Sequence, residues 1–322
     1  MQIVINMKKG IAVAGSVLVD KINEINSYPN VGELTKILDL SLAVGGCVPN
    51  VAIDIKKVAP DIDVYALGKI GVDAEGKYVK DVFTNNKIDI NGLKEDAKNK
   101  TSFTEVMSIK GGQRTFFTYA GASSDYGIDD IDFDSLNVKM LHLGYFLLLD
   151  KIDNGDGLEI LKKAKEKGIT TSIDLVTENS DRYKLVLPCL PYTDNLIINE
   201  TEAGRITDIE PTKENLPKIC KKLSELGVKE RIIIHMPELS ILYHNGEILT
   251  LDSIDIPKNL IKGKTGAGDA FCAGSLIGIY NELSDKEILE VASKVAVCSL
   301  TAPDATSGLM PLEKIEELLK TF

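Results

Sequence analysis

The chain of 322 residues, 44% of them hydrophobic, is long enough for one large α/β domain or two smaller ones. Its formal net charge of −11 argues against a nucleic-acid-binding role, because a phosphate backbone selects for Lys and Arg. The first ten residues are too short and too weakly apolar for a signal peptide, and no apolar run approaches the roughly 20 residues of a membrane span. An odd number of cysteines, without zinc-motif spacing, predicts reduced core residues in a cytoplasmic protein: Cys47, Cys189, Cys220, Cys272 and Cys298.

Short apolar runs alternate with amphipathic stretches along most of the chain. We predict strands at residues 11–15, 64–67, 140–143, 171–174, 195–199 and 231–235. We predict helices at residues 49–58, 73–83, 157–167, 216–226, 268–280, 284–298 and 311–319. Ser284 and Glu287 form a capping-box pair at the start of one of these helices. Strands that alternate with helices predict a mostly parallel sheet covered on both faces.

Two regions depart from this rhythm. Residues 17–44 and 101–119 alternate apolar and polar side chains, as antiparallel strands with one solvated face do. Residues 110–113, with two adjacent glycines, are typical of a hairpin turn. No linker separates these regions from the rest, so we predict a single domain over 1–322 that carries them as a small β-sheet.

The densest chemical signal is Gly266-Ala267-Gly268-Asp269, placed immediately before a predicted helix. A helix N-terminus presents unpaired N–H groups and attracts anions. Asp269 in the first turn could accept a proton from a substrate hydroxyl while the amides hold a phosphoryl group. A tight turn in which Asp269 only caps the helix is the alternative that the motif alone leaves open.

Two other glycine motifs are excluded. A P-loop ending at Gly263 would need a glycine where this chain has Lys258. A dinucleotide fingerprint through Gly266 and Gly268 would need a third glycine at Phe271.

Four segments together resemble the signatures of the ribokinase-like (PfkB) carbohydrate kinases: residues 45–52, 68–76, 265–274 and the Asn-x-x-Glu element of Asn199 and Glu202. They occur in the family order, and the resemblance runs from about Ile11 to the C-terminus. It implies a three-layer α/β fold with a mostly parallel central sheet and a small β-sheet lid. It also implies ATP-dependent phosphorylation of a hydroxymethyl group on a small carbohydrate, fructose- or ribose-like.

The resemblance assigns roles to individual residues. Asp269 would be the base, and the amides of Gly266, Ala267 and Gly268 would form the anion hole. Asn199, Glu202 and Thr265 would serve the nucleotide phosphates and Mg²⁺, with no metal held directly by a side chain. The substrate would contact Asp20, Gly45, Gly46, Asn50 and Arg114.

Several of these residues have a simpler structural explanation. Asn199 would equally cap the next helix, and Asp20 could be an exposed turn residue. Arg114 is as well explained as a solvated strand charge. Asp174, at a strand end, would either support the sugar or phosphate or cap the following segment. His142 is expected in the core or the pocket wall.

The sequence departs from the family pattern at residues 235–240, where a Thr-x-Gly-x-x-Gly turn is missing. This departure leaves the identity of the phosphate donor open. It also leaves open the alternative that the chain is a non-catalytic ligand-binding protein on the kinase fold. A nucleoside kinase is the other alternative, since four aromatic residues could stack on a base: Phe116, Phe117, Tyr119 and Phe146. The resemblance also implies a homodimer through the lid and leaves room for a monovalent cation as cofactor.

Overall fold

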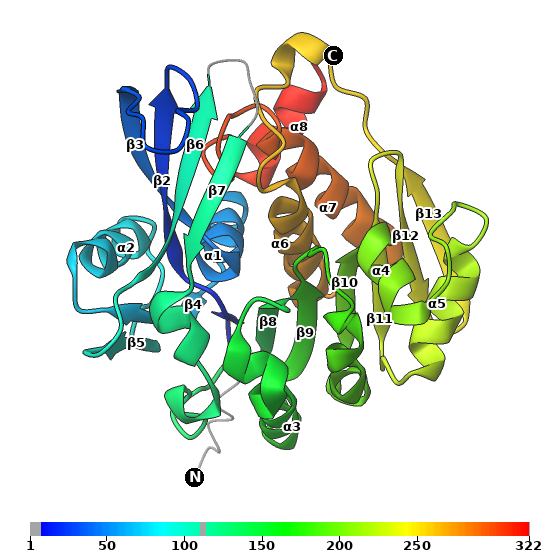
Figure 1. Cartoon of the computed structure of the whole chain (residues 1–322). Helices are drawn as coiled ribbons and strands as arrows, with labels where there is room; N and C mark the ends of the chain where they lie inside the picture. The colour runs from blue at the N-terminus through cyan, green and yellow to red at the C-terminus, as the bar shows by residue number, and fades with distance from the viewer. Residues whose placement is uncertain (1–7, 110–113, 322) are drawn as a thin grey trace.

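The structure is a computed structural model that describes residues 8–109 and 114–321, so the predicted turn at 110–113 lies outside the described residues. Its larger sheet has nine strands in the order β13-β12-β11-β10-β9-β8-β1-β4-β5 (Figure 1). The seven strands from β11 to β5 are parallel, whereas the β11–β12 and β12–β13 pairs are antiparallel. The strands are β1 (Ile11–Ala14), β4 (Val64–Gly71), β5 (Leu93–Asp96), β8 (Met140–Phe146), β9 (Thr170–Leu175), β10 (Asn195–Asn199), β11 (Arg231–His235), β12 (Leu239–His244) and β13 (Glu247–Asp252).

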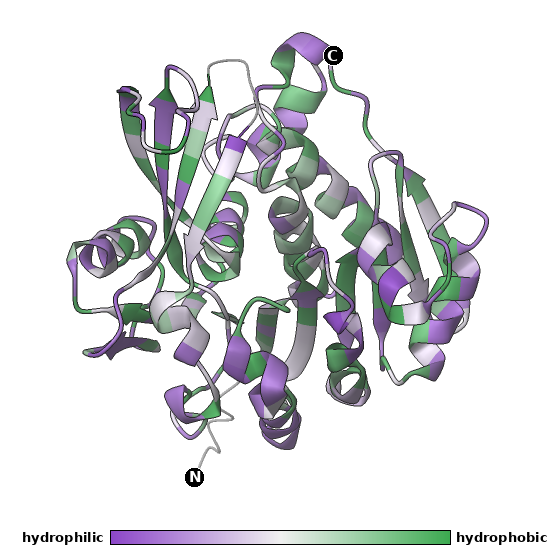
Figure 2. Ribbon diagram, in the orientation of Figure 1, coloured by the Kyte–Doolittle hydropathy of each residue, from purple (hydrophilic) through white to green (hydrophobic). Residues whose placement is uncertain are grey.

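Helices cover both faces of this sheet, which confirms the three-layer prediction. One hydrophobic cluster packs the first face under α1 (Cys47–Val58), α2 (Ala74–Asn85), α6 (Ala267–Tyr280), α7 (Asp285–Ser299) and α8 (Leu312–Leu319). A second cluster lies under α3 (Gly157–Glu166), α4 (Glu200–Thr207) and α5 (Leu216–Glu225). Figure 2 shows hydrophobic residues along the central strands and a hydrophilic outward side on α3. Within the described residues, no helix is long and apolar enough to cross a bilayer.

The α6 helix explains why the core is deep at this position. Its residues from Asp269 to Ile279 are all buried, because α1 and α7 flank it while the sheet lies beneath. A helix that is apolar on all sides is a core helix. Its N-terminus therefore opens at the carboxyl edge of the parallel strands, the edge where ligands bind in open α/β sheets.

The small sheet has the order β3-β2-β6-β7 and is built from the two regions predicted to form it. Its strands are β2 (Leu18–Ile25), β3 (Ile37–Gly45), β6 (Ser102–Ile109) and β7 (Arg114–Tyr119). We call this four-stranded sheet the lid sheet. β2 pairs with β3 antiparallel and with β6 parallel, so the chain enters the lid sheet twice from the large domain.

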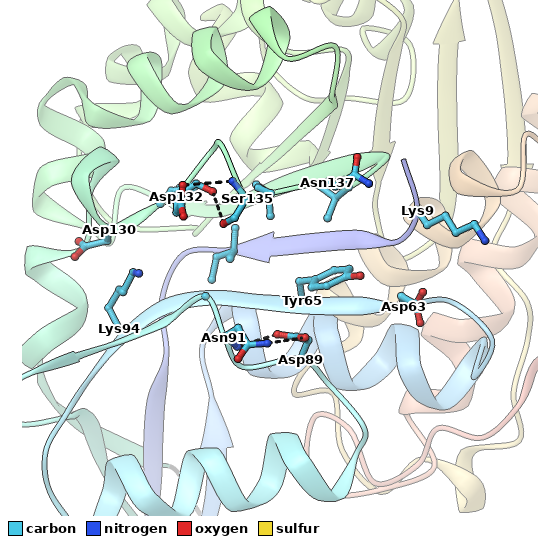
Figure 3. A pocket seen from close by; sticks show the side chains of 15 residues that line it. Lys9, Asp63, Tyr65, Asp89, Asn91, Lys94, Asp130, Asp132, Ser135 and Asn137 are labelled. Atoms are coloured by element: carbon cyan, nitrogen blue, oxygen red, sulfur yellow. Dashed lines mark hydrogen bonds between the residues drawn. The ribbon is translucent and has the colours of Figure 1, made fainter. Parts of the chain in front are cut away.

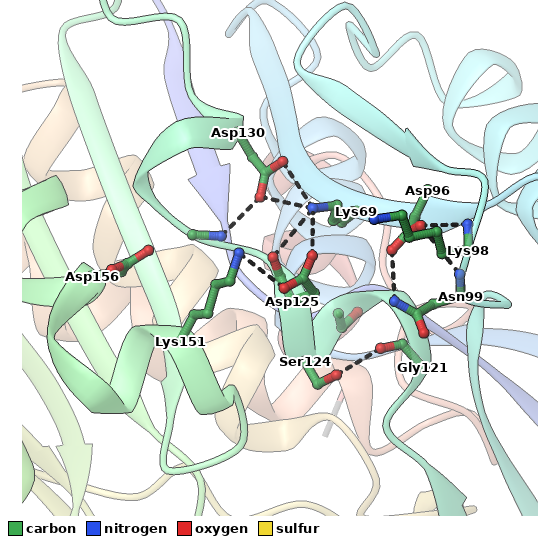
Figure 4. A network of polar contacts seen from close by, with 12 residues as sticks. Lys69, Asp96, Lys98, Asn99, Gly121, Ser124, Asp125, Asp130, Lys151 and Asp156 are labelled. Atoms are coloured by element: carbon green, nitrogen blue, oxygen red, sulfur yellow. Dashed lines mark hydrogen bonds and ion pairs between the residues drawn. The ribbon is translucent and has the colours of Figure 1, made fainter.

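Polar contacts fasten the base of the lid sheet. Asp73, the N-cap of α2, accepts hydrogen bonds from the backbone N–H and the hydroxyl of Thr101 at 2.8 and 2.6 Å. The Ser123 hydroxyl donates to Val17 O at 2.8 Å. Beyond β7, Lys69 reaches carboxylates of Asp125 and Asp130 at 3.1 Å (Figure 4). The segments entering and leaving the lid sheet are thus held, while the strands project away.

Candidate active site

The first turn of α6 carries the predicted anion hole. Gly266 is the N-cap, with φ 78°, and a Cβ there would lie 2.5 Å from Cβ of Ala305. Both the left-handed backbone and the close approach therefore require glycine. The next residues, Ala267, Gly268 and Asp269, start the helix, where backbone N–H groups have no intrahelical acceptor. Amides and the positive end of the helix dipole converge where an anion would sit.

Asp269 is buried in this turn, and its two side-chain donors among the described residues both bond to one carboxyl oxygen. Asn50 Nδ2 and the Tyr145 hydroxyl donate to its Oδ2 at 2.8 and 2.9 Å. Burial raises the pKa of Asp269 to about 7, and the nearby Asp174 carboxylate adds to the effect, whereas the two hydrogen bonds oppose it. A carboxyl group with a pKa near neutrality suits a proton acceptor at physiological pH.

Asp174 and Tyr145 approach from the neighbouring strands. Asp174, near the end of β9, accepts the backbone N–H of Tyr145 at 2.6 Å and lies 3.3 Å from His142 Nε2. Tyr145 is in the left-handed region, with φ 60°, a costly conformation for a non-glycine residue. This backbone bend at the end of β8 presents its hydroxyl to Asp269.

Asn199 and Glu202 form a capping box at the start of α4. Glu202 N donates to Asn199 Oδ1 at 2.9 Å, and Asn199 N donates to Glu202 Oε2 at 3.0 Å. The other Glu202 oxygen accepts hydrogen bonds from Thr177 Oγ1 and Asn199 Nδ2 at 2.7 and 2.8 Å. Burial raises the pKa of Glu202 to about 8, although these hydrogen bonds act against it. The cap geometry that the sequence offered as an alternative is present, and the pair also lines the cavity beside Asp269.

Two adjoining cavities open at the N-terminus of α6. The smaller, of about 210 Å³, is lined by Asp174, Asn199, Glu202, Asp269 and the glycine turn. The larger, of about 610 Å³, lies between the β11–β12 turn, residues 253–264 and α7. Five residues line both cavities: Asn199, His235, Lys264, Ala267 and Gly268. The larger space is in the range of a nucleotide-sized ligand, and the smaller lies at its inner end, against the amides.

The other side of Asp269 leads to the lid sheet. Asn50 is buried one turn into α1, whose N-cap is Gly46 with φ 90°. Gly45 adjoins Asp20, because a Cβ on Gly45 would lie 2.6 Å from Asp20 Oδ2. Burial raises the pKa of Asp20 to about 6. Asp20 is thus a half-buried carboxylate rather than an exposed turn residue, next to the helix that holds Asn50.

Comparison with known proteins places this arrangement in a family. Residues 8–312 match the family described as pfkB family carbohydrate kinase. The chain belongs to this family. Its members transfer a phosphoryl group to an alcohol group of their substrate, so the chain is a carbohydrate kinase.

The relatives cover nearly the whole kinase. A ribokinase from Arabidopsis thaliana is 25% identical over 315 residues, 96% of this chain and 81% of the relative. A probable chloroplastic fructokinase-6 from the same plant is 28% identical, and the match covers 86% of this chain and 74% of the relative. The solved Arabidopsis thaliana ribokinase complexed with ribose and ATP superimposes with a TM-score of 0.85 at 23% identity, covering 98% and 99% of the two chains.

Two predicted site residues lie apart from this centre. The lid-sheet register aligns Asp20 with Thr104 and Thr118, so Arg114 begins β7 four residues further out, about 13 Å along the strand. Arg114 is exposed on that outer end. Thr265 is exposed in the loop before α6 and does not line either cavity of the kinase.

Of the aromatic residues considered for base stacking, Phe146 is excluded. It is 1% exposed within the second core cluster. Phe116, Phe117 and Tyr119 remain on the exposed lid strand β7.

The structure adds residues that the sequence motifs did not indicate. Tyr145 donates a hydrogen bond to the Asp269 carboxylate, and Lys264 adds a positive charge where the two cavities meet. Asp54, one helical turn after Asn50, is fully buried, and neither carboxyl oxygen has a hydrogen-bond partner among the described residues. In the sequence, only the four-residue helical spacing from Asn50 could have indicated that Asp54 lies near the site. Lys264 lies within the glycine-rich segment, but no sequence pattern singled it out as a site residue.

A separate cavity of about 700 Å³ lies beside β4 and β5 (Figure 3). It is larger than either active-site cavity and is lined by mixed charges, among them Lys9, Asp63, Lys94 and Asp132. Its Asp89 carboxylate is already bonded to Asn91. None of the predicted catalytic or anion-hole residues lines it, so it is not the candidate site for phosphoryl transfer.

Proposed function

We propose that this kinase transfers the γ-phosphoryl group of ATP to a hydroxymethyl group of a small sugar, fructose- or ribose-like, with Asp269 as the base. The observation that carries the proposal is the position of Asp269. A buried carboxylate, with its pKa raised to about 7, stands in the first turn of a helix whose first residues line a cavity next to it.

The chemistry follows from these parts. Asp269 accepts the proton of the substrate hydroxyl as its oxygen attacks the γ-phosphorus, and the bond from that phosphorus to the β,γ-bridging oxygen breaks, which releases ADP. The amides of Ala267 and Gly268 stabilise the charge on the transferring group. Asn50 and Tyr145, both donors to Oδ2, orient the carboxylate for this transfer.

The larger cavity would hold the nucleotide. Its lining includes apolar side chains of Ile256, Ile261, Phe271 and Val297, and the buried Ser240 hydroxyl without a partner among the described residues. These groups suit a planar base with one polar contact. Although residues 235–240 lack the two family glycines, the cavity beside them stays open, which supports ATP as the donor.

Mg²⁺ would be coordinated by the ATP phosphates and by water rather than by a protein carboxylate. Within the described residues, the Glu202 carboxyl group accepts hydrogen bonds from Thr177 Oγ1, Asn199 N and Asn199 Nδ2. Direct coordination would break these bonds, whereas Mg²⁺ readily keeps several waters. We therefore assign Asn199 and Glu202 to the outer shell of the Mg²⁺ ion, where they would contact its bound waters. The charge of the ion itself would shield the phosphates.

The sugar would bind between α1 and the lid sheet. Asp20, Gly45 and Asn50 lie on that side of Asp269, and a carboxylate that accepts two hydroxyls suits a polyol. Names of the relatives, ribokinase and fructokinase, favour a sugar over a nucleoside. Closure of the lid sheet would exclude water, a competing phosphoryl acceptor.

One assay tests this function. Coupled ADP release is measured over sugars, sugar phosphates and nucleosides, with ATP and Mg²⁺, with and without K⁺. A sugar should give saturable turnover, and a K⁺ requirement would identify a monovalent cation as a cofactor. Turnover with nucleosides alone would favour the nucleoside kinase, and binding without ADP release would favour the non-catalytic protein.

The base assignment has its own test. Asp269→Asn keeps the shape of the side chain but removes the proton acceptor, so kcat should fall by about 10²–10⁴-fold. Sugar and ATP binding, measured by calorimetry, should change little. The exposed Asp129→Asn serves as the control with unchanged kcat. Retained turnover in Asp269→Asn would remove Asp269 as the base.

A further inference from the structure

Beneath Asp269 lies a buried cluster of metal-ligand side chains, of which Asp174 alone has entered the account of phosphoryl transfer, through the effect of its charge on the pKa of Asp269. One donor atom each of Cys47, His142 and Asp174 lie within 4.8 Å of one another. They come from the first turn of α1 and from the neighbouring strands β8 and β9. The Cys272 sulphur, from α6, lies 3.6 Å from Nε2 of the same His142.

The distances around His142 Nε2 match those between ligands of one tetrahedral ion. Nε2 lies 3.3 Å from Asp174 Oδ2, which corresponds to an angle of about 104° at a zinc ion with bonds of about 2.1 Å. The 3.6 Å to Cys272 Sγ corresponds to an angle of about 110° with a Zn–S bond of about 2.3 Å. Both angles are close to tetrahedral. The Cys47 sulphur, within 4.8 Å of the other two donors, needs an inward shift on the order of an ångström.

The surroundings of these side chains also suit a metal site. The other nitrogen of His142, Nδ1, lies 3.0 Å from Ser172 Oγ, the kind of outer contact that fixes the tautomer of a ligating histidine. Gly144 makes room for Cys47, because a Cβ at Gly144 would stand 1.9 Å from the Cys47 sulphur. The remaining Asp174 oxygen is oriented by the Tyr145 N–H.

Charge and access complete the argument. Two thiolates, from Cys47 and Cys272, one carboxylate and a neutral imidazole carry three negative charges, so a bound divalent ion would offset two of them and leave a net charge of −1. Asp174 and Cys272 both line the 210 Å³ cavity, which provides a path for entry. Burial raises the pKa of Cys47, so binding must release a thiol proton, as zinc binding to cysteine normally does.

We propose that Zn²⁺ binds to Cys47, His142 and Asp174, with Cys272 as the fourth ligand, in the floor of the kinase active site. Sulphur and imidazole donors select zinc over Mg²⁺, which prefers oxygen. The site is thus distinct from the place of the nucleotide-borne Mg²⁺. It does not depend on the proposed substrate or on Asp269 as base.

The test measures metal rather than turnover. The full chain is stripped with a chelator and titrated with Zn²⁺ against a chromophoric competitor in the presence of excess Mg²⁺, and bound metal is counted by mass spectrometry. One Zn²⁺ per chain with an apparent Kd at or below about 1 µM is expected. With Co²⁺ as the probe, the intense visible bands of a tetrahedral ion and thiolate charge transfer should appear.

Variants locate the ion. In Cys47→Ser and in Cys272→Ser, the thiolate-to-cobalt band should become weaker. Cys47→Ser should also weaken Zn²⁺ binding by more than about 100-fold, because the loss of an outer contact alone costs about 10–100-fold. Gly144→Ala should weaken it too, by displacing the Cys47 sulphur. Cys220→Ser, a buried cysteine in the other core cluster, is the matched control and should bind as the parent does.

Three results would overturn the proposal. These are no stoichiometric Zn²⁺, equal Zn²⁺ affinity in the parent and Cys47→Ser, or a weak octahedral Co²⁺ spectrum. Circular dichroism of each variant, compared with Cys220→Ser, separates the loss of a ligand from the loss of the fold. A folded Cys47→Ser with parental affinity is decisive against the site.

Discussion

At the scale of single residues, the proton balance of Asp269 rests on opposing contributions. Burial and the Asp174 charge raise its pKa to about 7, while hydrogen bonds from Asn50 and Tyr145 favour the ionised form. Because both donors meet Oδ2, removing one of them should leave the carboxylate in place but change its pKa. The pH dependence of turnover therefore reports on this arrangement.

The first prediction concerns that pH dependence. A base works only when unprotonated, so in the zinc-free enzyme kcat/KM should rise with pH through about 7 and be lost on acidification. In Tyr145→Phe one stabilising hydrogen bond is gone, and the acid limb should move up by about one pH unit. Steady-state kinetics from pH 5 to about 9 measure both.

Tyr126→Phe is the matched control, because the Tyr126 hydroxyl is buried without a partner among the described residues, away from Asp269. Its profile should match the parent. An unchanged acid limb in Tyr145→Phe would show that the hydroxyl does not stabilise the Asp269 carboxylate.

Asp54 carries the second prediction. It is fully buried with both oxygens unpaired, and burial raises its pKa well above 3.8, with Asp269 adding to the effect. The folded state then holds a proton that the unfolded state releases above about pH 4, so the free energy of unfolding falls as pH rises from there towards the folded pKa. This penalty should be largest at alkaline pH.

Asp54→Leu removes both unpaired oxygens while nearly preserving shape. We expect it to raise the free energy of unfolding by about 1–3 kcal/mol at pH 8 and by less at pH 5. At pH 5 the Asp54 of the parent protein is protonated, and a protonated carboxyl group costs less to bury than an ionised one. Urea denaturation at the two pH values measures the difference. Asp61→Asn, an exposed acid beyond the end of α1, should show neither change. An equal gain at both pH values would contradict the titration of Asp54.

At the scale of elements, local patterns predicted the parts of the fold that local chemistry determines. The apolar runs at β10 and β11 were predicted at their exact bounds, and the Ser284–Glu287 capping box opens α7 as expected. The β12–β13 hairpin was missed: β13 is an exposed edge strand with little buried face to create a pattern, whereas β12 was missed although its first four residues are buried. The order of the strands is a non-local outcome that no single window of sequence contains.

The same distinction applies to the site. The glycine turn and Asp269 are contiguous, so a motif could indicate them. Tyr145 and Cys47 reach the centre from β8 and α1, and only the packing of those elements against α6 brings them there. Spacing along the chain therefore gave no zinc pattern, although the cysteines are buried as predicted.

The third prediction concerns the lid strand β7, whose successive side chains point to opposite faces of the lid sheet. The register places Phe116 on the same face as Thr118, Thr104 and Asp20, whereas Phe117 lies on the opposite face. Both rings are about equally exposed, 60% and 59%. We infer that Phe116 covers the bound sugar when the lid sheet closes.

Phe116→Ala should therefore raise the KM for the sugar by about 5–10-fold with little change in kcat, the effect of losing roughly 1 kcal/mol of aromatic contact. Phe117→Ala is the matched control from the other face and should keep the parental KM. Sugar-saturation kinetics of the two variants provide the comparison. Equal effects in both would mean that the ring acts through the lid sheet as a whole.

At the scale of the whole molecule, the lid sheet leaves apolar side chains uncovered on the face away from Asp20. The register puts Leu40, Leu42 and Phe117 on that face, and they are between 49% and 60% exposed. β3 and β7 are its two edge strands, with one side of the backbone unpaired. Lys21 and Glu105 lie between Leu42 and Phe117 in the same row across the sheet, so these exposed apolar side chains belong to the two edge strands, and edge strands favour pairing with another chain.

We therefore infer that two copies of the kinase associate through their lid sheets. A charge on the apolar edge strand β3 should separate them, because it would be buried without a partner in the dimer. Leu40→Glu should convert a dimer to a monomer in sedimentation at micromolar concentration. Leu185→Glu, at an exposed leucine outside the lid sheet, should leave the dimer intact. A parent that sediments as a monomer, or a Leu40→Glu variant that remains dimeric, would contradict association through this face.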